Sequence, residues 1–143
     1  MRKRIESGFT LIEVMVVVVI LGILAAIVVP RIMSRPDEAR TVKAQQDLRA
    51  IAAALDLYKL DNFSYPNTAM GLEALVTKPA TLQAGANWRD EGYLTKIPTD
   101  PWGATYQYLA PGQHGDYDLY SLGADGVLGG EGVNQDLGNW SLE

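Results

Sequence analysis

Hydrophobic residues form one continuous stretch near the start of the chain, residues 9–29, in which Glu13 is the only charged residue. From Val14 onward, every position of this stretch is apolar or glycine. A helix rises about 1.5 Å per residue, so about twenty residues span the hydrocarbon core of a bilayer, which is about 30 Å thick. The pattern therefore predicts a membrane-spanning helix over residues 9–29, with a leader over residues 1–8 before it and one further domain, residues 30–143, after it.

A second hydrophobic pattern, with the period of an amphipathic helix, lies beyond this stretch. Residues 37–61 contain no glycine or proline and are rich in helix formers. Pro30 and Pro36 predict a kink near the start of this helix. Five apolar residues are spaced by four, three, four and three positions, which places them on one face that should pack on a small domain: Ala44, Leu48, Ile51, Leu55 and Tyr58.

The remaining domain shows the pattern of short β-strands. Residues 104–110 and 117–122 are rich in tyrosine, and a Pro-Gly-Gln-His-Gly segment separates them. This arrangement predicts two antiparallel strands, which need a helix to cover them because an isolated pair is only marginally stable. A short helix is expected over residues 71–76, and Trp102, in a turn, is expected in the core. We therefore predict an α+β fold, in which a long N-terminal helix packs on a small antiparallel sheet that is followed by a long C-terminal loop.

The charges beside the apolar stretch predict how the chain lies in a membrane. Three basic residues at positions 2–4 precede it, and by the positive-inside rule this end stays in the cytoplasm while everything after Pro30 faces the other side. A cleaved secretory signal peptide is the alternative. The stretch is longer than a signal-peptide core, contains a carboxylate and lacks a polar segment before Ala25 and Ala26, so a retained span is favoured. The absence of cysteine is compatible with export.

Glu13 is the most informative residue of the apolar stretch. An ionised carboxylate inside hydrocarbon costs on the order of 3 kcal/mol on insertion scales, so it should have a partner. No lysine, arginine or histidine lies between Glu13 and Arg31, so a cationic partner has to come from another molecule or from the chain's own N-terminus. Such a pair would set the axial register between packed helices. The alternative is that Glu13 lies at the headgroup boundary, hydrated or protonated, without a role.

Acidic residues dominate the C-terminal part of the chain. Residues 123–138 contain six glycines and no helix or strand pattern, and they lie between Leu122 and Trp140, which we expect to be buried. Calcium would order such a loop, because it takes about six to eight oxygen ligands from carboxylates and carbonyls. The spacing is not that of an EF-hand, and a solvated acidic loop is the alternative. No lysine or arginine follows Lys96, whereas seven acidic residues do: Asp100, Asp116, Asp118, Asp125, Glu131, Asp136 and Glu143.

Candidate catalytic residues are few. The only histidine, His114, lies in a glycine-rich turn, there is no cysteine, and no Ser-His-Asp or histidine-rich metal pattern is apparent. Asp116 and Asp118 would share one face of a strand, where a solvated face is favoured over a catalytic carboxylate pair. We therefore expect no enzymatic activity, and a membrane-anchored hydrolase is the most distant alternative.

Residues 8–15, GFTLIEVM, followed by the apolar run, resemble the processing and assembly segment of type IV pilins and type II secretion pseudopilins. The resemblance implies that a prepilin peptidase cleaves the chain between Gly8 and Phe9 and that Phe9 is then N-methylated. It also implies that Glu13 orients a subunit as it joins a growing helical filament.

Later segments are similar to the major pseudopilin of type II secretion. The resemblance implies a pilin-like fold and a structural subunit that polymerises into the periplasmic pseudopilus and supports export of folded proteins across the outer membrane. It also implies one calcium ion, held by Asp125, Asp136 and the carbonyl of Leu122. Type IV pilins usually carry a C-terminal cysteine pair, which this chain lacks, and a type IV pilin or minor pseudopilin is the alternative. The similar segments are GYL at 92–94, DPWG at 100–103, YQY at 106–108 and SLGADG at 121–126.

The same resemblance implies where the chain acts and with what partners. It places the chain in the bacterial inner membrane as a single-pass protein with its C-terminal domain in the periplasm, and afterwards in the assembled pseudopilus. The implied partners are further copies of the chain in a helical homopolymer, minor pseudopilins, the prepilin peptidase, and an inner-membrane assembly platform with its ATPase. Membrane lipid surrounds the helix before assembly, and no nucleic acid is expected as a partner.

Overall fold

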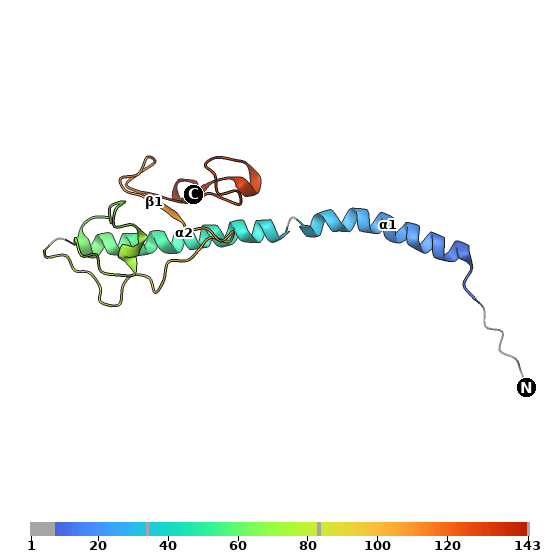
Figure 1. The fold of residues 1–143 in the computed structure, drawn as a ribbon, viewed down its shortest axis with the longest axis horizontal. Coiled ribbons are helices and arrows are strands. Elements are labelled where there is room, and N and C mark those ends of the chain that lie inside the picture. Colours follow the sequence, from blue (N-terminus) through green and yellow to red (C-terminus); the bar gives the residue numbers. More distant parts are fainter. Residues whose placement is uncertain (1–7, 34, 83, 143) are drawn as a thin grey trace, which may run out of the picture. The chain divides into compact units, whose positions relative to one another are not determined.

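The computed structural model describes residues 8–33, 35–82 and 84–142 of the 143-residue chain (Figure 1). Residues 1–7 of the expected leader lie outside the described residues. The chain divides into two compact units, Met1–Glu38 and Ala39–Glu143. Helix α1 (Leu11–Met33) belongs to the first unit, whereas most of helix α2 (Arg35–Asn62) and the whole sheet belong to the second.

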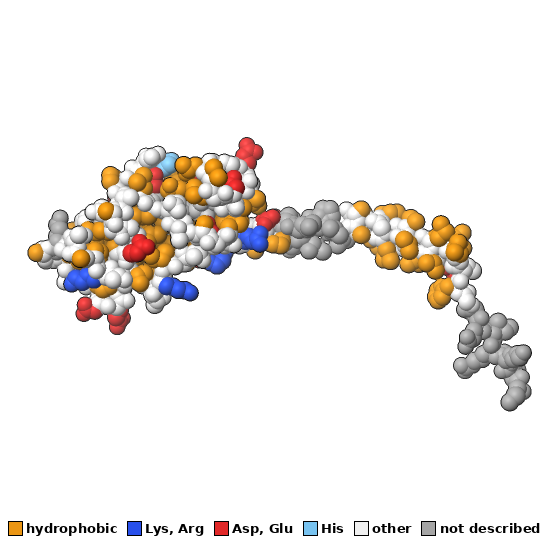
Figure 2. Space-filling model, in the orientation of Figure 1, with side chains coloured by type: hydrophobic (Ala, Val, Ile, Leu, Met, Phe, Trp, Pro, Cys, Tyr) orange, Lys and Arg blue, Asp and Glu red, His pale blue; other side chains and the backbone are white. Residues whose placement is uncertain are grey.

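Helix α1 carries most of the apolar stretch. Its side chains from Leu11 to Ile27 are exposed, and Figure 2 shows hydrophobic side chains over much of the surface of this segment. Among the described residues, no helix is both long enough and apolar enough to cross a membrane.

Helix α2 buries the face that its spacing predicts. Its last turn is closed by a 2.7 Å hydrogen bond from the backbone N–H of Phe63 to the carbonyl of Lys59. The side chain of Asn62, the last residue of the helix, donates a 2.9 Å hydrogen bond to the carbonyl of Tyr58. Five side chains on the buried face are at most 2% exposed, which confirms the predicted stripe: Ala44, Leu48, Ile51, Leu55 and Tyr58.

Three short antiparallel strands form the sheet, in the order β1-β2-β3. Strands β1 (Gln107–Leu109) and β2 (Asp118–Ser121) are the pair predicted from the tyrosine-rich runs, and Tyr108 lies opposite Leu119. Strand β3 (Leu137–Gly138) pairs with β2 and was not predicted, because only two residues at the end of a glycine-rich segment form it. Two 3₁₀-helices, η2 (Gly132–Asn134) and η3 (Asn139–Ser141), flank β3.

The core lies between the buried face of α2, the sheet and a third 3₁₀-helix, η1 (Leu72–Leu75), which confirms the short helix expected there. Leu119 of β2 is fully buried in this cluster. Tyrosine hydroxyls attach the sheet region to other elements: Tyr106 donates a 3.0 Å hydrogen bond to Asp47 of α2, and Tyr108 donates one of 2.7 Å to the carbonyl of Pro66. Burial, followed by the bond to Asp47, raises the pKa of Tyr106 far above its ordinary value. Hydrophobic burial and directed polar contacts therefore support the same packing.

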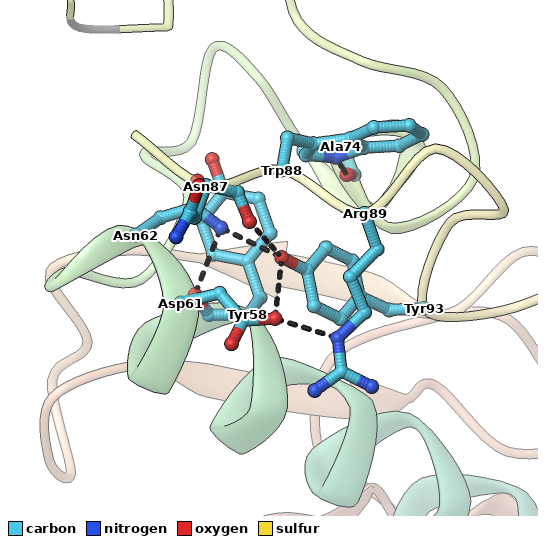
Figure 3. A network of polar contacts seen from close by, with 8 residues as sticks. All are labelled: Tyr58, Asp61, Asn62, Ala74, Asn87, Trp88, Arg89 and Tyr93. Atoms are coloured by element: carbon cyan, nitrogen blue, oxygen red, sulfur yellow. Dashed lines mark hydrogen bonds and ion pairs between the residues drawn. The ribbon is translucent and has the colours of Figure 1, made fainter. Parts of the chain in front are cut away.

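Polar contacts fasten the connection after η1 to the end of α2 (Figure 3). Nε of Arg89 lies 2.6 Å from Oδ2 of Asp61, and the Tyr93 hydroxyl accepts a 2.9 Å hydrogen bond from the side chain of Asn62. The indole nitrogen of Trp88 donates a 2.9 Å bond to the carbonyl of Ala74. These contacts hold a segment that has neither helix nor strand among its described residues.

Three expectations about side chains are wrong. Trp102 is only partly buried and lies outside the hydrophobic cluster, because the buried carboxylate of Asp100 holds its turn by accepting hydrogen bonds from the N–H groups of Trp102 and Ala104. Trp140 is 38% exposed because its ring stacks at the surface. Asp118 is buried rather than solvated, since local donors surround its carboxylate.

Candidate functional site

The expected cleavage site lies in an exposed segment ahead of α1. Gly8 and Phe9 have neither helical nor strand structure, and the Phe9 side chain is 90% exposed. A Cβ added at Gly8 would meet no atom within 4 Å. The peptide bond between the two residues is therefore open to an approaching enzyme.

Thr10 and Glu13 together cap the start of α1. One carboxylate oxygen of Glu13, Oε2, accepts hydrogen bonds from the Thr10 backbone N–H and from the Thr10 hydroxyl, each at 2.8 Å. The Glu13 N–H in turn donates a longer, 3.4 Å bond to the Thr10 hydroxyl. This reciprocal pattern is a capping box, which satisfies backbone donors that the first turn of a helix leaves unpaired.

The capping box gives Glu13 neutral hydrogen-bond partners, which we had not predicted. The spacing of Thr10 and Glu13, three residues apart at the start of an apolar run, is itself the sequence signal for this motif. Among the described residues, no cationic side chain forms an ion pair with Glu13. The carboxylate is thus oriented by its own helix, through hydrogen bonds from Thr10.

The three expected calcium ligands lie around one closed loop. A 2.9 Å hydrogen bond from the N–H of Ala124 to the carbonyl of Val133 joins the two ends of this loop. Asp125 is exposed and accepts a 3.1 Å bond from the N–H of Val127. Leu122 is partly buried just before the loop, and Asp136 is partly buried just after it.

Among the three expected ligands, Asp136 has the side chain whose surroundings best fit a cation. Its Oδ2 accepts a 2.9 Å bond from the N–H of Gly129, but Oδ1 is buried and has no hydrogen-bond partner among the described residues. A buried carboxylate oxygen without a partner is costly, and a cation would satisfy it. A Cβ at Gly123 would lie 3.0 Å from the carbonyl oxygens of both Asn134 and Gln135, so backbone oxygens crowd the same loop.

These residues match the chemistry of calcium better than that of a transition metal. Calcium accepts carboxylate and backbone carbonyl oxygens in irregular geometry, whereas transition metals favour histidine and cysteine. Within the described part of the chain, no group of three or more His, Cys, Asp or Glu side chains could hold a metal ion. An ion in this loop would therefore take most of its ligands from the backbone.

A second polar cluster, not expected from the sequence, joins the turn before β2 to the C-terminal region. The buried carboxylate of Asp118 accepts hydrogen bonds from the N–H groups of Gln113 and His114, at 2.9 and 3.0 Å. Nδ1 of His114 lies 3.0 Å from the same carboxylate, and its ring stacks on Trp140 with centroids 4.1 Å apart. Burial opposes ionisation of Asp118, but the hydrogen bonds outweigh it and lower the pKa of this carboxyl.

Comparison with known proteins agrees with these features. Residues 31–140 match the family described as "Type II secretion system (T2SS), protein G", and residues 3–29 match the "Prokaryotic N-terminal methylation motif". The type II secretion system core protein G of Pseudomonas aeruginosa is 64% identical over 140 residues, which cover 98% of this chain and 99% of the relative. That of Vibrio cholerae is 54% identical over 142 residues, covering 99% of this chain and 97% of the relative.

A solved structure gives the same result for the fold. The crystal structure of the major pseudopilin from the type 2 secretion system of enterohaemorrhagic Escherichia coli superimposes with a TM-score of 0.68 at 46% identity. The match covers 80% of this chain and 97% of that one. With this agreement over most of its length, the chain belongs to the type II secretion system protein G family, the family of the major pseudopilins.

Proposed function

We propose that this chain is the major structural subunit of a type II secretion pseudopilus. Copies of it polymerise into a helical periplasmic filament that supports export of folded proteins across the outer membrane. The observation that carries this proposal is the match of residues 31–140 to the protein G family together with the fold of a major pseudopilin. The same match favours the major subunit over a type IV pilin or a minor pseudopilin, and the subunit has a structural rather than an enzymatic role.

Processing of the N-terminus is the first step of the proposed pathway. A prepilin peptidase cleaves between Gly8 and Phe9, and the new N-terminus of Phe9 is methylated. The methylation motif at residues 3–29 and the exposed position of this peptide bond support the proposal. Cleavage places the ammonium group of Phe9 one helical turn before Glu13. The N-terminus of an adjacent subunit can also reach the Glu13 carboxylate.

Before assembly, the apolar segment anchors the subunit in the inner membrane as a single span, with the C-terminal domain in the periplasm. The length and composition of residues 9–29 and the basic residues before them support this topology. Glu13 then pairs with the N-terminus of a neighbouring subunit and fixes the axial register of the filament. Its carboxylate, already oriented by Thr10, is available for this contact.

Extraction of the subunit from the membrane costs free energy, because the exposed apolar surface of α1 is favourable in lipid. We expect this surface to be covered by the same helices of other subunits in the filament. An inner-membrane assembly platform with its ATPase supplies the energy, and minor pseudopilins join the same filament.

Calcium completes the C-terminal loop in this proposal. Asp125 and Asp136 supply carboxylate oxygens and Leu122 supplies a carbonyl, with further backbone oxygens from the loop. The buried Oδ1 of Asp136, for which the described residues provide no hydrogen-bond partner, supports a cation at this place. The ion would hold the glycine-rich segment against the sheet and so lower the entropy cost of ordering it.

The test of the proposed function is the intact mass and N-terminal fragment sequence of the chain purified from the membranes of its own bacterium, combined with electron microscopy of overexpressing cells. A chain that begins at methylated Phe9 and forms filaments is the expected result. A chain that retains Met1, or that is cut near Ala26 and released, would contradict the proposal.

A further inference from the structure

Two exposed apolar patches lie on the second compact unit, outside its hydrophobic core. The helix-end patch consists of Leu57, Leu60 and Phe63; Leu60 is 73% and Phe63 is 83% exposed. The loop patch consists of Val127 and Leu128, both exposed at the tip of the C-terminal loop. Exposed clusters of large apolar side chains are typical of protein interaction sites.

Phe63 has an unusual backbone conformation for its residue type. Its φ is +65°, in the left-handed region, where it follows the last residue of α2. Glycine or asparagine normally occupies this position after a helix, because a Cβ is strained there. Here the strained residue presents a large aromatic ring to solvent, and strained residues concentrate at functional surfaces. The helix-end patch is therefore a candidate for contact with another molecule.

The two patches lie at opposite ends of the unit. The helix-end patch is at the C-terminal end of α2, whereas the C-terminal loop lies toward the first half of that helix (Figure 1). A hydrogen bond of 3.5 Å from Arg49 to the carbonyl of Leu142 places the C-terminal residues beside the middle of α2. One copy can therefore offer the loop patch in one direction and the helix-end patch in the other.

The surroundings of the loop patch are more acidic than those of the helix-end patch. Residues 97–143 contain seven acidic residues and no lysine or arginine, whereas residues 39–96 contain seven lysines and arginines and six acidic residues. Asp125 and Glu131, both exposed, flank the loop patch. The surface hollow that contains Leu60 and Phe63 is lined by one residue of each charge, Asp56 and Lys59, and Lys59 also pairs with Asp116 at 3.0 Å. Two loop patches facing each other would bring carboxylates together, so a contact between unlike patches is favoured.

We propose that the loop patch of one copy docks on the helix-end patch of a second copy, head to tail. This inference rests on the proposed function, because a contact between two unlike surfaces generates an open helical filament when its rotation does not close into a ring. Leu128 and Phe63 are the central residues of the contact. Within the filament, the copy on one side occupies the loop patch and the copy on the other side occupies the helix-end patch.

Cysteine cross-linking tests the contact, because the chain contains no cysteine of its own. Full-length Phe63→Cys and Leu128→Cys chains are co-expressed and assembled, filaments are checked by electron microscopy, and cysteines are oxidised with copper phenanthroline. The expected result is a covalent dimer from the mixture and a ladder of oligomers from the double variant. Thr77→Cys, at another exposed position, replaces Phe63→Cys in the matched control and should give no ladder.

The outcomes separate this contact from the proposed function. Wild-type filaments together with variant filaments that lack the cross-link would overturn the contact alone. Dimers formed by Phe63→Cys with itself in the filaments, without the mixed product, would likewise overturn it. A wild-type chain that forms no filament would overturn the proposed function and, with it, the contact.

A second variant guards against a folding artefact. Phe63→Asn removes the aromatic ring but keeps a residue that tolerates the left-handed conformation. The melting temperature should be unchanged or higher, while filament yield falls by about five- to tenfold, as expected for loss of a central interface side chain. Unchanged filament yield from this variant would overturn the proposal.

Discussion

Arg89 reaches back across 28 residues of sequence to Asp61, and its Nε lies 2.6 Å from the carboxylate Oδ2 (Figure 3). The hydrogen bond from Arg89 holds the pKa of Asp61 below its usual value, and the Tyr93 hydroxyl bonds to the same oxygen at 3.2 Å. The guanidinium also lies 5.5 Å from the centre of the Tyr93 ring. Asp61 thus organises the attachment of an irregular connection to the C-terminal turn of α2.

Removing the charge of this pair should loosen the connection. Asp61→Asn should lower the melting temperature of the full chain by a few degrees, and Arg89→Gln by a similar amount. The double variant should lose little more than either single one, because both changes remove the same interaction. Near-ultraviolet circular dichroism in detergent measures these transitions through the aromatic side chains, and fully additive losses would contradict the coupling.

Truncating the buried face of α2 should have a larger effect. Leu55 is fully buried in the hydrophobic cluster, so Leu55→Ala should lower the free energy of unfolding by about 2–5 kcal/mol. Leu60→Ala, on the exposed side of the same helix, is the matched control and should change it by less than about 0.5 kcal/mol. Urea denaturation followed by circular dichroism measures both, and equal losses would contradict the assigned core.

Glu13 should matter for assembly rather than for insertion. Glu13→Ala removes both the carboxylate proposed to pair with a neighbour and the acceptor that caps α1. The variant should still insert in the inner membrane, which cell fractionation measures, but should form few or no filaments. Val17→Ala serves as the control, because it changes an exposed residue of α1 one turn later without removing a charge. Normal filaments from Glu13→Ala would contradict a role in setting register.

Calcium should stabilise the chain through its C-terminal loop. The wild-type melting temperature should rise when calcium replaces chelator, and Asp136→Ala and Asp125→Ala should reduce this rise. Glu131→Ala changes an exposed carboxylate in the same loop that is not a proposed ligand, so it should keep most of the rise. Identical melting with calcium and with chelator would exclude the metal site.

The lowered pKa of Asp118 predicts a loss of stability in acid. Because this pKa is lower in the folded chain than in the unfolded chain, where it is about 3.9, the carboxylate's contribution is fully present above that value and is lost as the pH falls below about 4. Asp118→Asn should therefore be less stable at neutral pH but should lose less stability on acidification. The free energy of unfolding of both chains is measured from pH 7 to pH 3. The same pH dependence in the wild-type chain and in Asp118→Asn would contradict the prediction.

Local patterns predicted the helices and the first strand pair well. The buried stripe from Ala44 to Tyr58 follows directly from helical periodicity, and β1 and β2 follow from two tyrosine-rich runs around a proline- and glycine-rich turn. The capping box of Thr10 and Glu13 was also available in the sequence, as a threonine and a glutamate three residues apart.

Contacts between distant segments could not be predicted in the same way. Strand β3 consists of two residues, too few to show an alternating pattern, and it exists because β2 offers a free edge. The buried Asp118 lies opposite Leu109 of β1, and the position of Trp140 depends on stacking against His114. Such features arise from tertiary structure, and sequence spacing alone does not encode them.

The hydrogen bond between Ala124 and Val133 has a consequence for how this chain can change over evolution. It brings the two ends of the C-terminal loop together, directly between β2 and β3, so the pairing of Tyr120 with Gly138 does not depend on the length of the loop's tip. Doubling the length of a flexible loop costs only about 0.6 kcal/mol of closure entropy. The sheet and the core should therefore tolerate insertions and deletions at the tip, whereas such changes would alter the loop patch of Val127 and Leu128.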